Sequence, residues 1–169
     1  MKRILLFVCI QFFLLASFAG ETINFCKGWK FHLGDAGKGA SSSSYNDSQW
    51  RILNIPHDWS IEGTYKQFEN GTDWQSGFLP AGISWYRKTF TIPSKWKNKK
   101  VQILFEGVYL NSEVWINGHW LGKRPNGYIS FVYDLTPSAS SSFLFFAAAS
   151  LTVVATARIE SRFRCSLSC

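Results

Sequence analysis

Alternation of apolar and polar residues, the pattern of a β-strand with one buried face, recurs along most of this chain. Residues 23–33 (INFCKGWKFHL), 83–92 (ISWYRKTFTI) and 101–106 (VQILFE) alternate in this way. Gly, Pro, Ser or Asn residues bound the runs, and no helical periodicity of useful length precedes Pro137. The pattern predicts an all-β domain of short antiparallel strands, arranged as a β-sandwich of the jelly-roll kind.

The most informative segment runs from residue 107 to residue 137 (GVYLNSEVWINGHWLGKRPNGYISFVYDLTP). The dipeptide Asn117-Gly118 separates two alternating runs, which predicts a two-residue hairpin turn with positive φ at both positions. A second turn-rich loop, residues 123–127, leads to a further alternating run over residues 128–135. The segment is therefore predicted to be a β-meander whose loops carry Arg, Asn and Tyr side chains suited to hydroxylated ligands.

The first nineteen residues have the layout of a secretory signal peptide, with a basic start, an apolar stretch over residues 4–16 and small residues at Ser17 and Ala19. The apolar stretch is shorter than the roughly 20 residues that span a bilayer. We therefore expect export to the periplasm or the extracellular space, with residues 1–19 removed and no membrane span.

Charge and cysteine content exclude several classes of partner. The formal net charge is +7, but residues 21–137 hold 13 Lys/Arg and 10 Asp/Glu, a balance of 13 − 10 = +3. The lysines of residues 95–100 lie in a turn-like segment, which favours a solvated loop over a nucleic-acid site. Cys26 is the one cysteine between residues 22 and 137, so neither an internal disulfide nor a metal site is predicted there.

Four motifs occur in a fixed order: residues 55–63 (IPHDWSIEG), 82–90 (GISWYRKTF), 105–119 (FEGVYLNSEVWINGH) and 133–137 (YDLTP). Together they resemble the N-terminal sugar-binding domain of glycoside hydrolase family 2, and above all that of the exported β-galactosidases. The resemblance covers residues 22–137. It implies a galactose-binding-like jelly roll that precedes an immunoglobulin-like domain and a catalytic (β/α)₈ barrel.

The resemblance also implies how the domain works. In that family the barrel holds the two catalytic glutamates, so this chain alone is expected to contain no catalytic residue and to be inactive. Glu106 and Glu113 lie in motifs without a catalytic role in the family. The expected partners are a β-galactoside-like glycan and the protein's own barrel, and no cofactor is implied. The alternative is a free-standing carbohydrate-binding module without catalysis.

Two positions correspond to sugar-proximal residues of the family. Asp58, in Pro-His-Asp-Trp, matches a position whose Asn or Asp approaches the sugar, and Asn126 matches a second position, on the loop before Tyr133. Each position also has a purely structural alternative. Asp58 could be a turn or cap residue ahead of Trp59, and Asn126 could form a tight turn with Gly127. His57 is a third candidate substrate contact, with a hydrogen-bonded loop histidine as its alternative.

Three tryptophans could also stack on sugar faces. These are Trp85, Trp115 and Trp120. Their positions in alternating runs predict core side chains for most of them.

Residues 138–169 depart from the family pattern. After residues 133–137 the family continues with a short turn and a strand of the form Asn-x-Ile-Ala-Val-x-Val, whereas residues 143–155 are apolar without alternation. Codons permitted for residues 157–165 can, in another frame, encode Lys-Asn-Arg-Ile-Ala-Val-Gln-Val. Residues 138–169 are therefore predicted to be an out-of-frame tail, which leaves the jelly roll incomplete at its C-terminus and the chain prone to aggregation.

Overall fold

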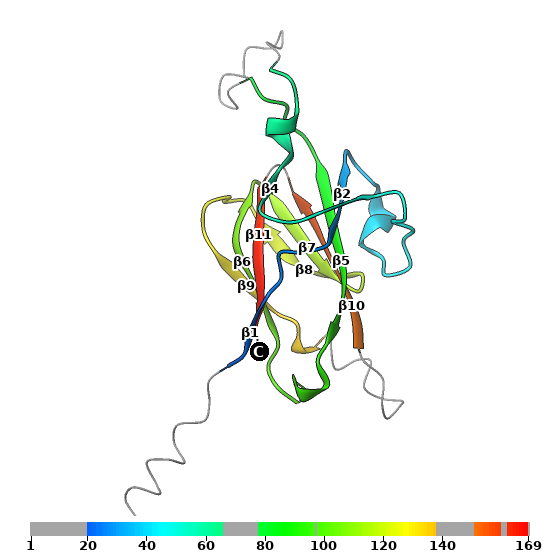
Figure 1. Cartoon of the computed structure of the whole chain (residues 1–169), viewed down its shortest axis with the longest axis vertical. Helices are drawn as coiled ribbons and strands as arrows, with labels where there is room; N and C mark the ends of the chain where they lie inside the picture. The colour runs from blue at the N-terminus through cyan, green and yellow to red at the C-terminus, as the bar shows by residue number, and fades with distance from the viewer. Residues whose placement is uncertain (1–19, 66–77, 97, 138–150, 160–161, 169) are drawn as a thin grey trace, which may run out of the picture.

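Two antiparallel sheets face each other as a β-sandwich (Figure 1). The computed structural model describes residues 20–65, 78–96, 98–137, 151–159 and 162–168, so the predicted signal peptide lies outside the described residues. The strands are β1 (Thr22–Asn24), β2 (Trp29–Leu33), β3 (Arg51–Leu53), β4 (His57–Asp58), β5 (Ser84–Ile92), β6 (Gln102–Tyr109), β7 (Ser112–Ile116), β8 (His119–Arg124), β9 (Phe131–Asp134), β10 (Leu151–Ile159) and β11 (Arg162–Ser168). Within the described residues, three short 3₁₀ helices connect them: η1 (Lys38–Ser41), η2 (Trp59–Glu62) and η4 (Ser94–Trp96). The predicted all-β jelly-roll class is confirmed.

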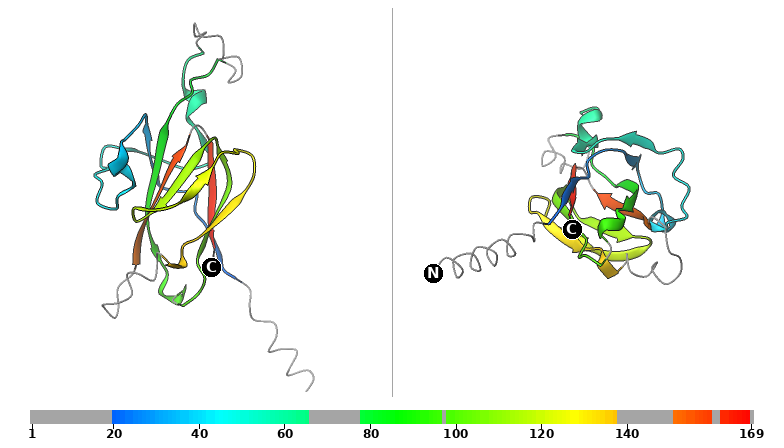
Figure 2. Two further views of the ribbon diagram at one scale, coloured as in Figure 1. Left: turned by 180° about the vertical axis from the view of Figure 1, so that it is seen from behind. Right: turned by 60° about the horizontal axis from the view of Figure 1, so that its bottom comes forward.

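Both sheets are made of strands that are distant in sequence. Sheet A has the order β1-β11-β6-β9, with β4 also paired to β11, and sheet B has the order β3-β2-β5-β10-β7-β8. Consecutive strands therefore cross repeatedly between the sheets, as the two further views show (Figure 2). Such long-range pairing is the reason that the sequence pattern predicts strands without predicting their neighbours.

The first predicted strand is divided in the structure. Residues 23–33 form β1 in sheet A and β2 in sheet B, and the chain changes sheet between them. Gly28 has φ 70°, a conformation that glycine adopts without a steric penalty. The Asn54 side chain accepts a hydrogen bond from the Gly28 N–H at 3.1 Å, and Asn24 accepts one from the Cys26 N–H at 2.9 Å. A turn at Gly28, held by the side chain of the distant Asn54, thus overrides the alternation that predicted one continuous strand.

The predicted hairpin is confirmed. Asn117 and Gly118 have φ values of 49° and 82°, as a two-residue turn of this type requires, and they join β7 to β8. The last strand of the meander is shorter than predicted. It begins at Phe131 instead of residue 128 because the preceding residues form a turn around Asn126.

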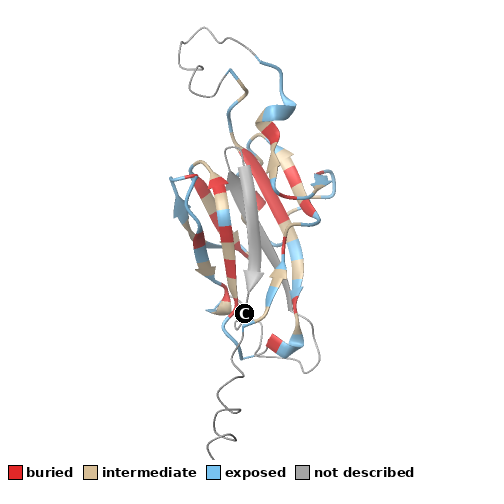
Figure 3. Cartoon of the chain, turned by 60° about the vertical axis from the view of Figure 1, so that its left-hand side comes forward, coloured by how far each residue is buried: buried red, intermediate tan, exposed pale blue. Residues whose placement is uncertain are grey.

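The main core lies between the sheets, where the buried rows of the strands face each other (Figure 3). Its largest buried side chains include Trp29, Tyr86, Trp96 and Phe105. Aromatic rings make much of the contact: Phe31 and Tyr86 lie 5.0 Å apart between ring centroids. Phe31 of β2 and Tyr86 of β5 are therefore part of what sheet B contributes to the core between the two sheets.

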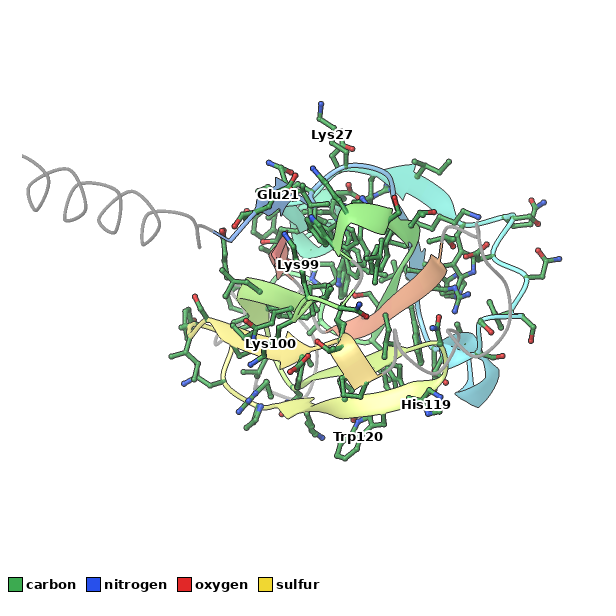
Figure 4. The ribbon with its side chains drawn as sticks, turned by 90° about the horizontal axis from the view of Figure 1, so that it is seen from below. Glu21, Lys27, Lys99, Lys100, His119 and Trp120 are labelled. Atoms are coloured by element: carbon green, nitrogen blue, oxygen red, sulfur yellow. The ribbon has the colours of Figure 1, made fainter. Side chains whose placement is uncertain are left out.

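A second, smaller cluster covers the outer face of sheet B. It contains Ala40, Trp50 and Trp85, with Trp115 packed against it, and the Trp85 and Trp115 rings stack at 5.6 Å. The expectation of mostly buried tryptophans holds for Trp85, which is buried, and in part for Trp115, which is half-buried. Trp120 departs from it with 62% of its surface exposed. It lies on the edge strand β8 and points away from the sandwich (Figure 4).

Arg87 holds the loop that covers this second cluster. Its side chain is only 2% exposed and donates hydrogen bonds to the carbonyls of Ala40 and Ser42 and, at 3.0 Å, to the Asp47 carboxylate. Lys30 contacts the same carboxylate at 2.6 Å. Burial acts to raise the pKa of Asp47, but the hydrogen bonds and charges of Lys30 and Arg87 outweigh it and hold that pKa below its ordinary value.

The lysines near η4 are solvated, as predicted. Lys95, Lys99 and Lys100 are exposed, and Lys97 lies outside the described residues. Lys95 pairs with Glu21 at 2.7 Å. Figure 4 views the molecule from the end that carries these lysines. Screened surface pairs of this kind contribute little to stability.

The structure corrects one part of the sequence-based fold. Two strands from beyond Pro137 occupy inner positions: β10 lies between β5 and β7, and β11 lies between β1 and β6. The prediction that the sandwich lacks its closing strands is therefore wrong. The run of β-branched residues at 152–154 is a strand signal that is hidden when residues 143–155 are treated as one apolar segment. The reading frame of residues 138–169 stays a prediction about the gene.

Candidate functional site at the β4 end of sheet A

Asp58 ends β4 and is the N-cap residue of η2. Its Oδ1 accepts hydrogen bonds from the Ser60 N–H at 3.2 Å and from the Ser60 hydroxyl at 2.6 Å. This is the capping geometry that Asp favours at the start of a helical turn. The carboxylate is half-buried at the rim of the sandwich. The capping role is thus observed, and Asp58 is held in one orientation at the surface.

His57 has protein partners at both ring nitrogens. Nδ1 lies 2.7 Å from the Tyr86 hydroxyl, and Nε2 lies 2.8 Å from Nη2 of Arg51 and 3.1 Å from Oε1 of Glu62. The His57 side chain is 11% exposed, and its ring packs edge-on to Phe31 at 4.9 Å. The hydrogen-bonded histidine considered as its alternative role is therefore observed.

Asn126 lies on the connection between β8 and β9. Its Oδ1 accepts a hydrogen bond from the Tyr128 N–H at 2.8 Å, which is the tight turn considered as its alternative role. The residue is exposed. The loop is anchored at both sides: the Asn111 N–H donates to the Pro125 carbonyl at 3.3 Å, and the Ser130 hydroxyl donates to the Glu106 carbonyl at 3.0 Å.

The fold brings Asp58 and the Asn126 loop to the same end of the sandwich. In sheet A, Asp58 is paired with Arg162 of β11, and Arg162 is paired on its other side with Tyr109 of β6. Adjacent strands lie about 5 Å apart, so Asp58 and Tyr109 are about 10 Å apart across the sheet. Gly127 packs directly on Tyr109. Figure 1 shows η2 and the β8–β9 connection at the same, upper end.

Exposed apolar side chains lie on the same two segments as these polar groups. Ile61 and Tyr65, in and after η2, are 65% and 73% exposed, and Tyr128 and Ile129, on the β8–β9 connection, are 82% and 54% exposed. The rings of Tyr128 and Tyr109 meet edge-on at 5.4 Å. This end of the molecule therefore combines oriented polar groups with exposed aromatic and aliphatic surface, a composition typical of a binding surface.

Gly127→Ala is expected to displace the Asn126 loop. A Cβ at this position would lie 2.5 Å from Cδ2 and 2.9 Å from Cα of Tyr109, closer than packed atoms can approach. Overpacking of this kind costs about 1–3 kcal/mol, which thermal or urea unfolding measures. Gly39→Ala is the matched control, because its Cβ would meet nothing closer than 3.8 Å. Equal stability of the two variants would contradict the close packing of Gly127.

Sequence reasoning missed three residues of this site. Arg51, Glu62 and Tyr86 contact His57 from β3, η2 and β5. Glu62 and Tyr86 lie in two of the four motifs, but nothing in the linear pattern marks any of the three residues as a partner of His57. Burial raises the pKa of Tyr86 above its ordinary value, and the charges of Asp58 and Glu62 act in the same direction. Burial likewise acts to raise the pKa of Glu62, but its hydrogen bonds with His57 and Arg51 outweigh this and lower it. One signal of this network was available in the sequence, namely Tyr86 in the predicted strand 83–92. The hydroxyl of a buried tyrosine usually needs a hydrogen-bond partner.

The described residues contain no group of three or more His, Cys, Asp and Glu side chains able to hold a metal ion. They also contain no helix whose length and apolar character would let it cross a bilayer.

A comparison with protein families decides the classification. A family model described as "Glycosyl hydrolases family 2, sugar binding domain" matches residues 25–154. This chain belongs to glycoside hydrolase family 2. The matched segment extends beyond Pro137 into β10, so the family 2 likeness is longer than the 22–137 that the motifs predicted. The family membership predicted from the four motifs is confirmed.

Relatives in family 2 agree with this assignment. "Beta-galactosidase BoGH2A" of Bacteroides ovatus is 52% identical over 117 residues, which is 69% of this chain and 14% of the relative. A "Beta-glucuronidase" of Formosa agariphila is 38% identical over 116 residues, which is 69% of this chain and 12% of the relative.

A solved structure, a beta-glycosidase from Bacteroides vulgatus, superposes with a TM-score of 0.76 and 73% identity over 88% of this chain and 20% of that chain. A family 2 structure from Bacteroides cellulosilyticus superposes with a TM-score of 0.70 and 30% identity over 87% of this chain and 20% of that chain. The chain thus spans between about a tenth and a fifth of the length of these relatives.

Proposed function

We propose that this chain is the sugar-binding domain of an exported family 2 glycosidase that hydrolyses terminal β-galactosides. In this proposal the domain binds the glycan through Asp58 and Asn126 and packs against the catalytic barrel of the same protein. The catalytic carboxylates belong to that barrel, so this domain supplies recognition without bond cleavage.

The observation that carries the proposal is the convergence of Asp58 and the Asn126 loop at one end of sheet A. A pyranose offers hydroxyl groups that donate and accept hydrogen bonds, and carboxylate and amide groups on anchored loops can bind them in pairs. Asp58 uses Oδ1 in capping and Asn126 uses its Oδ1 in a turn, so both side chains are already oriented before a ligand arrives. The likeness to a β-galactosidase of Bacteroides ovatus favours the galactoside among the sugars that family 2 enzymes use.

Export is part of the proposal. It is supported by residues 1–19, whose basic start, apolar stretch and small residues match a signal peptide. An exported location would place the domain where extracellular glycans are available.

Titration of residues 20–169 with methyl β-galactoside tests the binding role, with methyl β-glucuronide as the competing sugar. Asp58→Ala removes a charged acceptor and is expected to weaken binding about tenfold or more, because hydrogen bonds to charged groups contribute roughly 1.5–3 kcal/mol. Asn126→Ala removes a neutral group, and a loss of about fivefold is expected. Calorimetry or ligand-observed NMR measures both.

Two residues with the same local chemistry serve as matched controls. Asp134 accepts a hydrogen bond from the N–H two residues later at 2.9 Å, as Asp58 does, but it lies at the other end of sheet A. Asn46 makes the same kind of turn as Asn126, with the Ser48 N–H at 3.1 Å. If Asp134→Ala and Asn46→Ala weaken binding as much as the site variants, the assigned site is wrong. Tight binding by the isolated chain, lost with Asp58→Ala, would instead favour the free-standing carbohydrate-binding module.

A further inference from the structure

Trp120 is exposed, whereas every other tryptophan of the described residues is buried or half-buried. It has 62% of its surface exposed and projects from β8 away from the sandwich (Figure 4). Trp120 is paired with Trp115 of β7, and residues directly opposite each other in a sheet carry their side chains on the same face. That face is the outer face of sheet B, where Trp115 stacks on the buried Trp85 at 5.6 Å. Trp120 therefore stands beside a packed aromatic pair.

A β-bulge in β8 places a second exposed side chain on this face. Two successive residues of β7 are paired with Trp120 and Gly122, so Leu121 is an extra residue in β8. Residues three apart in a regular strand, such as Trp120 and Lys123, point to opposite faces, but the extra residue brings both to the outer face. Packing against sheet A fixes the bulge, because a Cβ on Gly122 would lie 2.8 Å from the Tyr133 hydroxyl.

Lys123 and Glu113 form the polar part of this face. They are paired across β8 and β7, and Nζ of Lys123 lies 3.6 Å from Oε1 of Glu113. Glu113 is two residues along β7 from the partner of Trp120, a separation of about 7 Å at the rise of a strand. An ammonium group only donates hydrogen bonds and a carboxylate only accepts them, so the pair offers both kinds to a ligand that lies on Trp120.

The size and composition of this surface favour a sugar over a protein partner. A specific protein interface buries about 800 Å² on each partner. The exposed area of Trp120 is on the order of 150 Å², and its neighbour on the same face is a charged pair instead of further apolar surface. A pyranose has a largely apolar face of C–H groups and a rim of hydroxyl groups. One indole beside one ion pair matches that combination.

We propose that Trp120 is the platform of a second glycan-binding surface, on which one sugar unit of an oligosaccharide stacks while Lys123 and Glu113 bind its hydroxyl groups. This surface goes beyond the proposed function, because it is separate from the Asn126 loop. Three residues of β7, or about 10 Å, separate the partners of Trp120 and Arg124, and Asn126 lies beyond Arg124 in the chain. A single sugar unit does not reach both places, so the platform holds a unit other than the one at Asp58 and Asn126.

NMR of the tryptophan indole groups tests the platform directly. The chain has 8 tryptophans, and the indole N–H signal that is missing from the spectrum of Trp120→Phe belongs to Trp120. Titration of residues 20–169 with β-1,4-galactotetraose is expected to shift this signal until it saturates. Trp120→Ala, followed at the amide signal of Lys123, should bind the tetraose about tenfold more weakly, the loss expected for one stacked ring. A Trp120 signal that does not move overturns the proposal.

Variants of neighbouring residues identify the contacts. Lys123→Met keeps most of the side-chain stem and removes the donor, so a loss of about fivefold is expected. Trp120→Tyr keeps an aromatic face and should retain most of the binding. His119→Ala is the matched control, because His119 is exposed but is paired with the buried Ile116 and so belongs to the opposite face of the sheet. A loss with His119→Ala as large as that with Trp120→Ala would mean that the assigned surface is wrong.

Asp58→Ala separates the platform from the proposed function. In this variant the tetraose should still shift the Trp120 signal, because the platform lies outside the Asp58 site. If the shift is lost, Trp120 is no separate surface and the proposal is wrong. If the shift persists while neither Asp58→Ala nor Asn126→Ala alters the binding of methyl β-galactoside, the proposed function fails and the platform stands.

Discussion

A chain shortened to end at Pro137 is expected not to fold. The truncation removes β10 and β11, which are inner strands of sheets B and A. β10 is hydrogen-bonded to β5 along residues 84–92 and to β7, and β11 is hydrogen-bonded to β6, β1 and β4. Without them each sheet divides into pieces whose backbone groups have no partner, and a two-stranded piece alone is marginally stable at best in water. The free energy of unfolding, which is about 5–15 kcal/mol for an ordinary domain, should be lost entirely.

Circular dichroism and thermal unfolding of residues 20–137 and residues 20–169 measure this effect. The longer chain is the control, because it lacks only the predicted signal peptide and keeps every strand. We expect a cooperative transition for the longer chain and none for the shorter one. Cooperative melting of residues 20–137 would show that β10 and β11 are dispensable and would restore the sequence-based domain boundary at residue 137.

Arg87→Ala is expected to cause the largest loss of stability among single substitutions. The guanidinium is 2% exposed and joins Asp47 to the carbonyls of Ala40 and Ser42, so its removal leaves several buried polar groups without their donor. Removing one partner of a buried charged network costs about 3–5 kcal/mol. The loop over Trp50 and Trp85 should also loosen, because Arg87 is its principal polar anchor.

Urea unfolding and tryptophan fluorescence measure both consequences. Arg87→Met keeps most of the side-chain volume, so its difference from Arg87→Ala separates packing from hydrogen bonding. Lys95→Ala removes a cation that is 63% exposed in its pair with Glu21, and a loss of less than about 1 kcal/mol is expected. A similar loss for Arg87→Ala and Lys95→Ala would mean that the Arg87 network does not hold the loop.

The hairpin at Asn117-Gly118 could be predicted because its cause is local. Positive φ at two successive positions favours these two residue types wherever they occur between alternating runs. The four family motifs were equally accessible, since they are contiguous stretches of sequence. The division of residues 23–33 into β1 and β2 was not accessible, because it depends on Asn54, which binds the Gly28 N–H from 26 residues away.

In the candidate site, too, some features follow from local sequence and others depend on residues far apart in the chain. Asp58, Asn126 and His57 could be selected from the sequence, and the capping and turn roles of the first two are local interactions between residues i and i+2. Their common location could not be predicted, because β11 lies between β4 and β6 and comes from the segment that seemed least like a strand. The partners of His57 were missed for a related reason: they come from β3, η2 and β5.

The sequence by itself determined the strand-rich class, the turn at Asn117-Gly118, the family and the residues that cap and turn at the site. Those features follow from backbone conformation and contiguous motifs, which act over a few residues. Only the tertiary structure decided which strands are neighbours, that Arg87 and Trp85 are buried on an outward face, and that His57 joins three elements. Those features depend on contacts between residues far apart in the chain, because a strand's pattern specifies which face is buried but not what covers it.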